Sequence, residues 1–234
     1  MNKEEFILEL EKLGINLSEQ QLSQFDTYYK LLISWNEKIN LTSITEENSV
    51  YLKHFYDCST IVKIIDLNNV ENLCDIGTGA GFPGIVIKIL FPNLKVTLVD
   101  ALEKRCKFLS DVIEKLNLDN IFVHHRRAEE FCINHTEEYD VVTSRAVASL
   151  RVLLELSAQL VKVNGYIIAL KANVEDEIKE SQTALGLLNL KLVNKKQFTL
   201  PYEESTRNIL LIEKIGKTNL KYPRKFSEIK KKPL

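Results

Sequence analysis

The stretch from residue 70 to residue 84 constrains the fold most, because an apolar, strand-like segment runs directly into a loop with four glycines. The strand pattern covers Glu71–Ile76, and the glycines are Gly77, Gly79, Gly81 and Gly84. Glycine has no Cβ, so this loop can adopt positive φ angles and bring its backbone close to a ligand. The apolar run Ile85–Leu90 follows. Strand, glycine loop and helix in this order predict a nucleotide-type site at the carboxyl end of the first strand of a doubly wound α/β sheet.

Strand-like and helix-like segments alternate after this loop. Further strands are predicted at 94–99, 121–125, 140–144 and 166–171, and helices at 84–91, 103–116, 149–163 and 174–187. This alternation is typical of a parallel sheet flanked by helices. Two more strands, 190–200 and 208–214, are separated only by Pro201–Arg207, which is shorter than the crossover of about a dozen residues that parallel neighbours need. We therefore predict a mostly parallel seven-stranded sheet with one antiparallel strand.

The first 69 residues show helical periodicity instead. Helices are predicted at 4–13 and 46–65. Between them, Ser18 and Gln21 form a capping-box pattern ahead of an apolar face that recurs every three or four residues up to Ile39. We expect this N-terminal helical extension, residues 1–69, to pack on a main domain at 70–216, with a basic C-terminal tail at 217–234.

Composition limits the class of protein. A length of 234 residues, a hydrophobic content of 45% and a net charge of −1 indicate a soluble globular protein rather than an obvious nucleic-acid binder. No apolar run approaches ~18 residues, and the charged N-terminus lacks the apolar core of a signal peptide, so we expect no membrane span and no targeting segment. The cysteines lack C-x-x-C spacing and the histidines lack metal-ligand spacing. We expect buried free thiols, a cytoplasmic location, no metal and, by default, a monomer.

The glycines fit two patterns. Gly79, Gly81 and Gly84 satisfy G-x-G-x-x-G, the fingerprint of NAD(P)-dependent oxidoreductases. Asp75, Gly77, Gly79 and Gly81 satisfy D-x-G-x-G-x-G, which resembles motif I of S-adenosylmethionine-dependent methyltransferases. Both cofactors require an acid about 20 residues further on to accept bonds from ribose hydroxyls, and Asp100 has that position. Asp100 is also placed to cap the helix that begins near Glu103.

The end of the chain favours the second pattern. A seven-stranded sheet with one reversed strand is the methyltransferase arrangement, whereas a dehydrogenase more often continues with a second parallel half. The turn Ala128–Glu129 after the third strand also fits adenine capture in methyltransferases, although it is equally a helix N-terminus with favourable acids.

Longer segments resemble one family. CDIGTGAGFPGI, VTLVDALEKRCKFL, RRAEEF, YDVVTSRAVASL, GYIIALKA and RNILLIEK together are similar to the small-subunit ribosomal RNA methyltransferase G family, also called glucose-inhibited division protein B. WNEKINLTSI, KHFYDCST and KYPRKFSEIKKKPL extend the resemblance over nearly the whole chain. It implies a class I, Rossmann-like methyltransferase that transfers a methyl group from S-adenosylmethionine to N7 of a guanine in 16S rRNA.

The resemblance also implies roles for single residues. Gly77 and Phe82 line the methyl donor, Ala128 and Glu129 hold its adenosine part, and Arg145 lies between donor and substrate. Guanine N7 carries an available lone pair and needs no general base, so catalysis would be chiefly positioning. Arg145 would orient the guanine or a phosphate, with Lys171 assisting. The open alternative for Arg145 is an ion pair with a neighbouring carboxylate.

An rRNA substrate, naked or in the small ribosomal subunit, requires positive surface. We predict RNA contacts at the exposed-looking basic residues Arg126, Arg127, Lys221, Arg224, Lys225, Lys230, Lys231 and Lys232. Tyr222 and Phe226 interleave with them and could stack on bases. A solvated, disordered tail remains the alternative, and a catalytically silent RNA-binding protein remains an alternative function.

Overall fold

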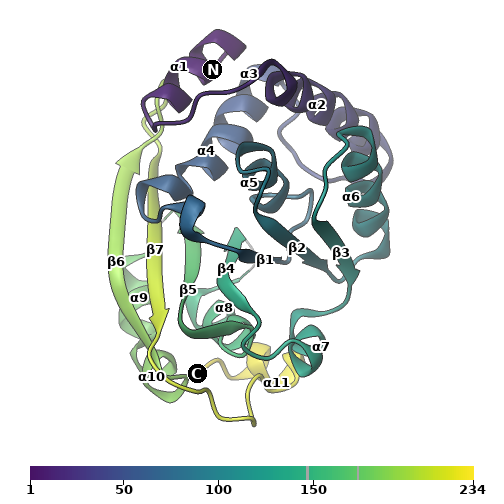
Figure 1. Ribbon diagram of the computed structural model, residues 1–234. Helices are drawn as coiled ribbons and strands as arrows, with labels where there is room; N and C mark the ends of the chain where they lie inside the picture. The colour runs from purple at the N-terminus through teal and green to yellow at the C-terminus, as the bar shows by residue number, and fades with distance from the viewer. Residues whose placement is uncertain (146–147, 173) are drawn as a thin grey trace.

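Seven strands form one mixed sheet through the middle of the molecule (Figure 1). The computed structural model describes residues 1–145, 148–172 and 174–234. The strands are β1 (Asn72–Ile76), β2 (Lys95–Asp100), β3 (Ile121–His125), β4 (Tyr139–Arg145), β5 (Val161–Lys171), β6 (Leu190–Thr199) and β7 (Thr206–Lys214). Their order across the sheet is β3-β2-β1-β4-β5-β7-β6. Strand β7 is antiparallel to both neighbours, which confirms the predicted sheet with one reversed strand.

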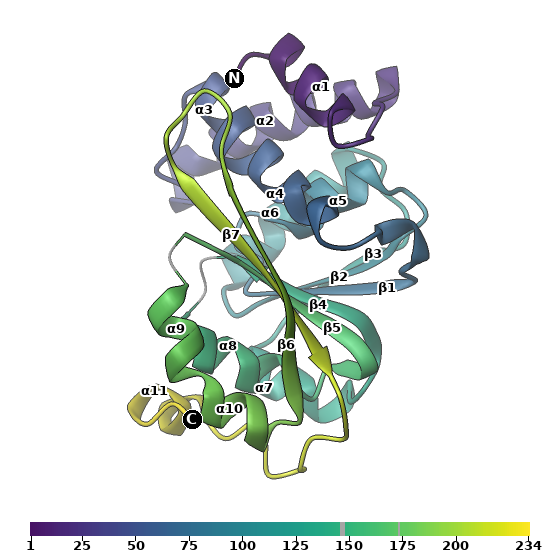
Figure 2. The same cartoon turned by 90° about the vertical axis from the view of Figure 1, so that its left-hand side faces the viewer.

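Helices from the first half of the chain cover one face of the sheet (Figures 1 and 2). They are α1 (Lys3–Glu11), α2 (Glu19–Ile39), α5 (Gly84–Leu90) and α6 (Glu103–Lys115). The predicted capping box of Ser18 and Gln21 opens α2. Side chains such as Phe25, Leu32 and Ile85 are fully buried in the core between these helices and the sheet. Burial of the apolar face of α2 is the main force that attaches it to the sheet.

Helices from the second half cover the opposite face and form a second core (Figure 2). They are α7 (Ala128–Phe131), η4 (Cys132–Asn134), α8 (Leu150–Ser157), α9 (Glu175–Glu180), α10 (Gln182–Leu187) and α11 (Phe226–Lys231). The four cysteines are buried free thiols, as predicted. Among the helices in the described residues, none combines the length and apolar character needed to cross a membrane.

Two predicted helices differ from the structure. The helix predicted at 149–163 ends at Ser157, and β5 already begins at Val161. Gly165 lies inside β5, where an added Cβ would be 2.7 Å from the carbonyl oxygen of Asp140. The apolar residues before Gly165 suit either a helix or a buried strand, and pairing with β4 decides the outcome. The helix predicted at 174–187 is divided at Ser181 into α9 and α10.

The helix predicted at 46–65 keeps its direction but changes its hydrogen bonding along the way. It consists of α3 (Glu47–Val50), the π-helix η1 (Tyr51–Tyr56), α4 (Asp57–Ser59) and the 3₁₀-helix η2 (Thr60–Lys63), and η3 (Leu67–Asn69) leads into β1. A π-helical turn has wider hydrogen bonding than an α-helix and occurs frequently at functional sites. Here η1 carries Lys53 and His54 to the edge where the parallel strands end.

The reversal of β7 brings one more segment to that edge. Asn208 near the start of β7 pairs with Lys171 at the end of β5. The first residues of β7 therefore lie beside the last residues of the parallel strands, although they are separated from them along the chain.

Candidate functional site

The loop after β1 is folded around one carboxylate. Asp75 is fully buried, and its Oδ2 accepts hydrogen bonds from Thr78 Oγ1 at 2.6 Å and from Gly84 N at 2.8 Å. Gly77 and Gly79 have φ angles of 63° and 60°, in the left-handed region that favours glycine. A Cβ built on Gly79 would have no non-adjacent heavy atom closer than 4.0 Å. The loop therefore presents bare backbone to open space.

Two adjoining cavities follow the carboxyl ends of β1, β2 and β3, and we call them together the strand-end cleft. The larger has a volume of about 380 Å³ and the smaller about 130 Å³. Gly77, Asp100 and Ala101 line both cavities. This is the edge where open α/β sheets bind ligands, and the combined size is that of a small-molecule site. The cleft brings together all the residues predicted to hold the donor, namely Gly77, Gly79, Phe82, Asp100, Ala128, Glu129 and Arg145.

Asp100 serves the protein as well as the cleft. It is only 3% exposed, and its Oδ2 accepts a hydrogen bond from Gly79 N at 2.9 Å while its Oδ1 accepts one from Leu102 N at 2.9 Å. Leu102 is the residue before the first turn of α6, so the helix-cap interpretation describes one of these bonds. A carboxylate has about four acceptor positions, so these two bonds leave capacity for a ligand hydroxyl.

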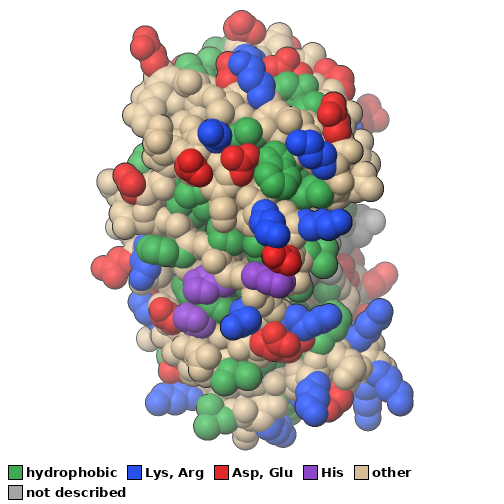
Figure 3. Space-filling view, turned by 90° about the vertical axis from the view of Figure 1, so that its right-hand side faces the viewer, with side chains coloured by type: hydrophobic (Ala, Val, Ile, Leu, Met, Phe, Trp, Pro, Cys, Tyr) green, Lys and Arg blue, Asp and Glu red, His purple; other side chains and the backbone are tan. Residues whose placement is uncertain are grey.

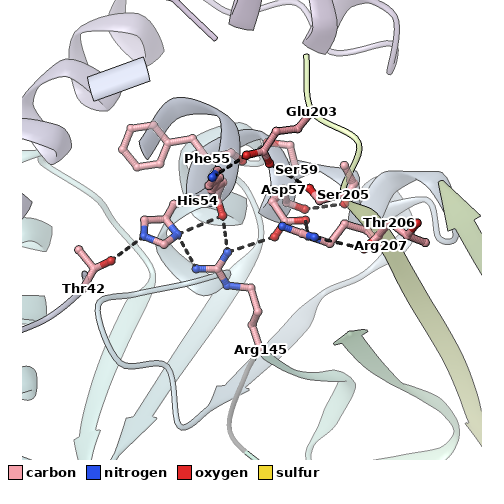
Figure 4. Close-up of polar contacts among 12 residues, drawn as sticks. Thr42, His54, Phe55, Asp57, Ser59, Arg145, Glu203, Ser205, Thr206 and Arg207 are labelled. Atoms are coloured by element: carbon pink, nitrogen blue, oxygen red, sulfur yellow. Dashed lines mark hydrogen bonds and ion pairs between the residues drawn. The ribbon is translucent and has the colours of Figure 1, made fainter. Parts of the chain in front are cut away.

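Arg145 at the end of β4 is held by the π-helical segment (Figure 4). Its Nη1 donates to the carbonyl oxygen of Lys53 at 2.8 Å and approaches Asp57 Oδ2 at 3.3 Å. Asp57 Oδ1 pairs in turn with Arg207 Nε from β7, also at 3.3 Å. The guanidinium centre lies 5.0 Å from the centroid of the Phe82 ring. The alternative that Arg145 forms an ion pair with a carboxylate is therefore realised, and the residue still lines the cleft.

His54 completes this cluster as a neutral ring. Its Nδ1 lies 2.9 Å from Arg145 Nη2, and a guanidinium cannot accept a hydrogen bond, so Nδ1 is the acceptor. The ring proton is then on Nε2, which donates to Thr42 Oγ1 at 2.9 Å. Burial and, to a smaller extent, the charge of Arg145 lower the pKa of His54 to about 3. The ring stacks on Phe82 with a centroid distance of 4.5 Å.

A further cavity of about 340 Å³ lies on the other side of this cluster and is called here the second cavity. His54 and Arg145 line both the strand-end cleft and the second cavity. Lys171 also lines the second cavity, but its Nζ donates to the carbonyl oxygen of Ala148 at 2.6 Å and to Glu177 Oε2 at 2.8 Å. Its ammonium group is thus occupied by protein acceptors in this structure.

Sequence reasoning missed three residues of this cluster: His54, Asp57 and Arg207. Two of them belong to a segment that was predicted only as helix core. The signal for Arg207 was present, because a reversed strand next to β5 must begin at the edge where β5 ends. Nothing in the helical periodicity indicated the π-helical turn that aims His54 at Arg145.

The residues predicted to bind RNA fall into two groups. Exposed positions are held by Arg126, Arg127, Lys221, Lys225, Lys230, Lys231 and Lys232. Arg224 instead donates from its backbone N, Nε and Nη2 to Glu155, which is fully buried. The prediction that Tyr222 could stack on bases is wrong, because Tyr222 is buried against α8 and its neighbours. Residues 217–234 therefore include a packed helix, α11.

Comparison with known proteins agrees with this geometry. The family model described as rRNA small subunit methyltransferase G matches residues 21–209. A protein of Bacillus subtilis named ribosomal RNA small subunit methyltransferase G is 52% identical over all of this chain and 99% of its own length. A protein of the same name from Exiguobacterium sibiricum is 48% identical, with full coverage of both chains.

Two solved structures share the fold at low sequence identity. A predicted O-methyltransferase from Agrobacterium tumefaciens has a TM-score of 0.53 at 14% identity, over 63% of this chain and 76% of its own. The TYW2 protein of M. jannaschii, solved with AdoMet, has a TM-score of 0.50 at 16% identity, over 61% of this chain and 67% of its own. The sheet with its reversed β7 is that of the class I methyltransferases. Within that class, the chain belongs to the rRNA small subunit methyltransferase G family, which decides against the oxidoreductase alternative.

The strand-end cleft fits the methyl donor of this class. The open space over Gly79 would be filled by a Cβ, so the loop is shaped for close approach of a ligand. In the described part of the chain, no group of three or more His, Cys, Asp or Glu residues is arranged to hold a metal ion.

Proposed function

We propose that this protein transfers the methyl group of S-adenosylmethionine to N7 of a guanine in 16S rRNA. The observation that carries the proposal is the junction of two cavities at Arg145 and His54. The strand-end cleft would hold the donor, and the second cavity would receive the guanine. Family membership supports the reaction type, and the shared wall supplies a place where a methyl group could pass from one ligand to the other.

The donor, when bound, supplies an electrophilic methyl group on a sulfonium. The residues of this chain would orient it: backbone around Gly77 and Gly79 at one end, Asp100 at the ribose, and Ala128 with Glu129 at the adenine. Nucleophilic attack by N7 needs no proton transfer, so the neutral His54 is suited to packing and orientation rather than to base catalysis. Holding N7 in line with the methyl group can supply up to about 7–11 kcal/mol in favourable cases.

The most informative experiment is mass spectrometry of 16S rRNA from a strain that lacks the gene. The expected result is loss of one 7-methylguanine, with recovery on complementation. Calorimetry on the purified protein should detect S-adenosylhomocysteine and not NAD. A folded protein that binds S-adenosylhomocysteine but leaves the rRNA unchanged would instead support the catalytically silent RNA-binding alternative.

Arg145 is the residue on which the transfer geometry depends. Arg145→Lys keeps one charge but loses the planar fork that contacts Lys53, Asp57 and His54 together. We expect kcat for rRNA methylation to fall about 100-fold, because a misplacement of about 1 Å at the reacting atoms has that cost. S-adenosylhomocysteine affinity should change by much less.

Single-turnover methylation and calorimetry measure the two quantities. Glu180→Gln is a suitable control, since Glu180 pairs with Arg151 on the surface, away from the cleft. An Arg145→Lys enzyme with normal kcat and normal rRNA affinity would leave Arg145 only its ion pair with Asp57.

The proposal extends to the remaining expectations about the chain. We infer a cytoplasmic, monomeric enzyme that acts on 16S rRNA or the small ribosomal subunit. We keep the division into an extension at 1–69, a methyltransferase domain at 70–216 and a basic C-terminal segment at 217–234. Lys171 would contribute to phosphate binding only if it releases Glu177.

A further inference from the structure

The smaller cavity of the strand-end cleft has one wall from a distant part of the chain. Its other walls come from the ends of β1 and β2, from the turn after β3, and from Leu156 of α8. The remaining wall is Phe226, the first residue of α11. Phe226 is half-buried, and the guanidinium centre of Arg127 lies 5.8 Å from its ring centroid. About one hundred residues separate this ring from the turn at Ala128 that it faces across the cavity.

The position of Phe226 is held by buried contacts. Arg224, two residues earlier, places three donors on the buried carboxylate of Glu155 at 2.6–2.9 Å. Tyr222 on one side and Ile229 on the other are buried in the core beneath α8. A bidentate, charge-assisted pair with a buried carboxylate fixes orientation as well as position. The ring is therefore a built part of the cavity and not the end of a loose tail.

The chemistry of the cavity suits a purine. Ile76, Val99, Leu156 and Phe226 supply apolar surface, while Glu129 and backbone groups after β3 supply polar contacts at the margin. A flat heteroaromatic ring gains from an aromatic face in offset or edge contact. The same cavity adjoins Asp100, where the ribose of the proposed donor would lie.

We propose that Phe226 is a donor-binding residue: the C-terminal segment closes the adenine end of the methyl-donor site with its aromatic ring. This inference rests on the proposed function and deepens it. The segment was predicted from its charge to bind RNA, and Lys225, Lys230 and Lys231 are exposed on the same helix. Contact of RNA with these lysines and binding of the donor at Phe226 would then be coupled, each strengthening the other to the same degree.

The test is calorimetric binding of S-adenosylhomocysteine to the full-length protein. Phe226→Ala should raise the dissociation constant about three- to tenfold, since an aromatic contact of this kind and a factor of ten in affinity are comparable in free energy. Phe226→Leu, which keeps apolar volume, should raise it less. Ser227→Ala is the matched control, because Ser227 is exposed on the same helix and lines no cavity of the cleft.

A second ligand separates adenine contact from a general loosening of the fold. 5′-Methylthioadenosine keeps the adenosine part and lacks the amino acid part, so Phe226→Ala should weaken it by the same factor as S-adenosylhomocysteine. Unchanged affinity in Phe226→Ala, or an equal loss in Ser227→Ala, overturns the inference while the proposed function stands. Failure of the folded wild-type protein to bind S-adenosylhomocysteine overturns both.

Discussion

Single side chains at the strand ends combine structural and functional positions. Asp100 accepts backbone hydrogen bonds from Gly79 and Leu102 and also borders the strand-end cleft. Arg145 pairs with Asp57 and also separates the cleft from the second cavity. Such pairing orients the side chain before a ligand arrives, which reduces the entropy lost on binding. An ion pair at Arg145 is therefore compatible with a role in methyl transfer.

The suppressed protonation of His54 predicts a dependence of stability on pH. The folded pKa of about 3 lies below the ordinary value of 6.5, so between these values the unfolded chain binds a proton that the folded protein does not. The contribution of His54 is fully present above pH 6.5 and is lost as pH falls toward 3. Between pH 7.5 and 5.0 the loss should reach about 2 kcal/mol.

Urea unfolding at the two pH values measures this contribution. His54→Asn offers an acceptor near the position of Nδ1 and cannot titrate, so its stability should fall less than that of the wild type over the same interval. His125→Asn, at an exposed site, should retain the wild-type pH dependence. Equal pH dependence in wild type and His54→Asn would contradict a buried neutral ring.

At the scale of elements, helix α2 supports the glycine loop from outside the sheet. Tyr28 of α2 is fully buried, and its hydroxyl donates to the carbonyl oxygen of Ala80. An added Cβ on Gly81 would be 2.7 Å from that hydroxyl, so the close contact also requires glycine at this position. The N-terminal extension therefore takes part in shaping the loop at the cleft.

Removal of this hydroxyl should affect both stability and ligand binding. Tyr28→Phe leaves the buried Ala80 carbonyl without its donor, which should lower the free energy of unfolding by about 1–3 kcal/mol. Affinity for S-adenosylhomocysteine should fall with it, because Gly79 and Phe82 flank the loosened turn. Urea unfolding and calorimetry measure the two effects.

Tyr29→Phe is the natural comparison for that change. The Tyr29 hydroxyl donates to the carbonyl oxygen of Thr45 at 3.2 Å in an exposed contact, which water can replace. Its substitution should cost less than 1 kcal/mol and leave ligand affinity unaltered. If the two variants behave alike, α2 does not support the loop through Tyr28.

For the molecule as a whole, the net charge of −1 conceals a local distribution. Figure 3 shows Lys and Arg side chains interspersed with Asp and Glu on one face of the molecule. Deletion of residues 221–234 would test RNA binding poorly, because it would leave the buried Glu155 without Arg224 and remove Phe226 from the cleft. Substitution of exposed lysines tests the charge alone.

Reversal of two charges on α11 should therefore weaken rRNA binding through electrostatics. The double variant Lys230→Glu with Lys231→Glu should reduce the slope of log affinity against log salt by about 1–2, since each lost phosphate contact removes ~0.7–0.9. Lys38→Glu with Lys115→Glu makes the same change of charge at exposed positions on α2's end and α6. A slope that both double variants lower equally would reflect net charge and not contact at α11.

Local patterns were sufficient for much of the architecture. The glycines after β1, the alternation of strands and helices, and the short link at Pro201–Arg207 each depend on neighbouring residues, and the structure confirms the strand order class that they predict. The boundary between α8 and β5 was not predictable in this way. Its residues suit both states, and the partner strand β4 makes the choice.

The sequence by itself determined the sheet, its reversed strand and the glycine loop at the end of β1, because periodicity and backbone conformation are properties of short segments. Tertiary structure alone decided that His54, Asp57, Arg145 and Arg207 form one cluster. It also decided that Phe226 reaches the strand-end cleft. These contacts join segments far apart along the chain, and burial against a shared sheet, which no local pattern encodes, brings them together.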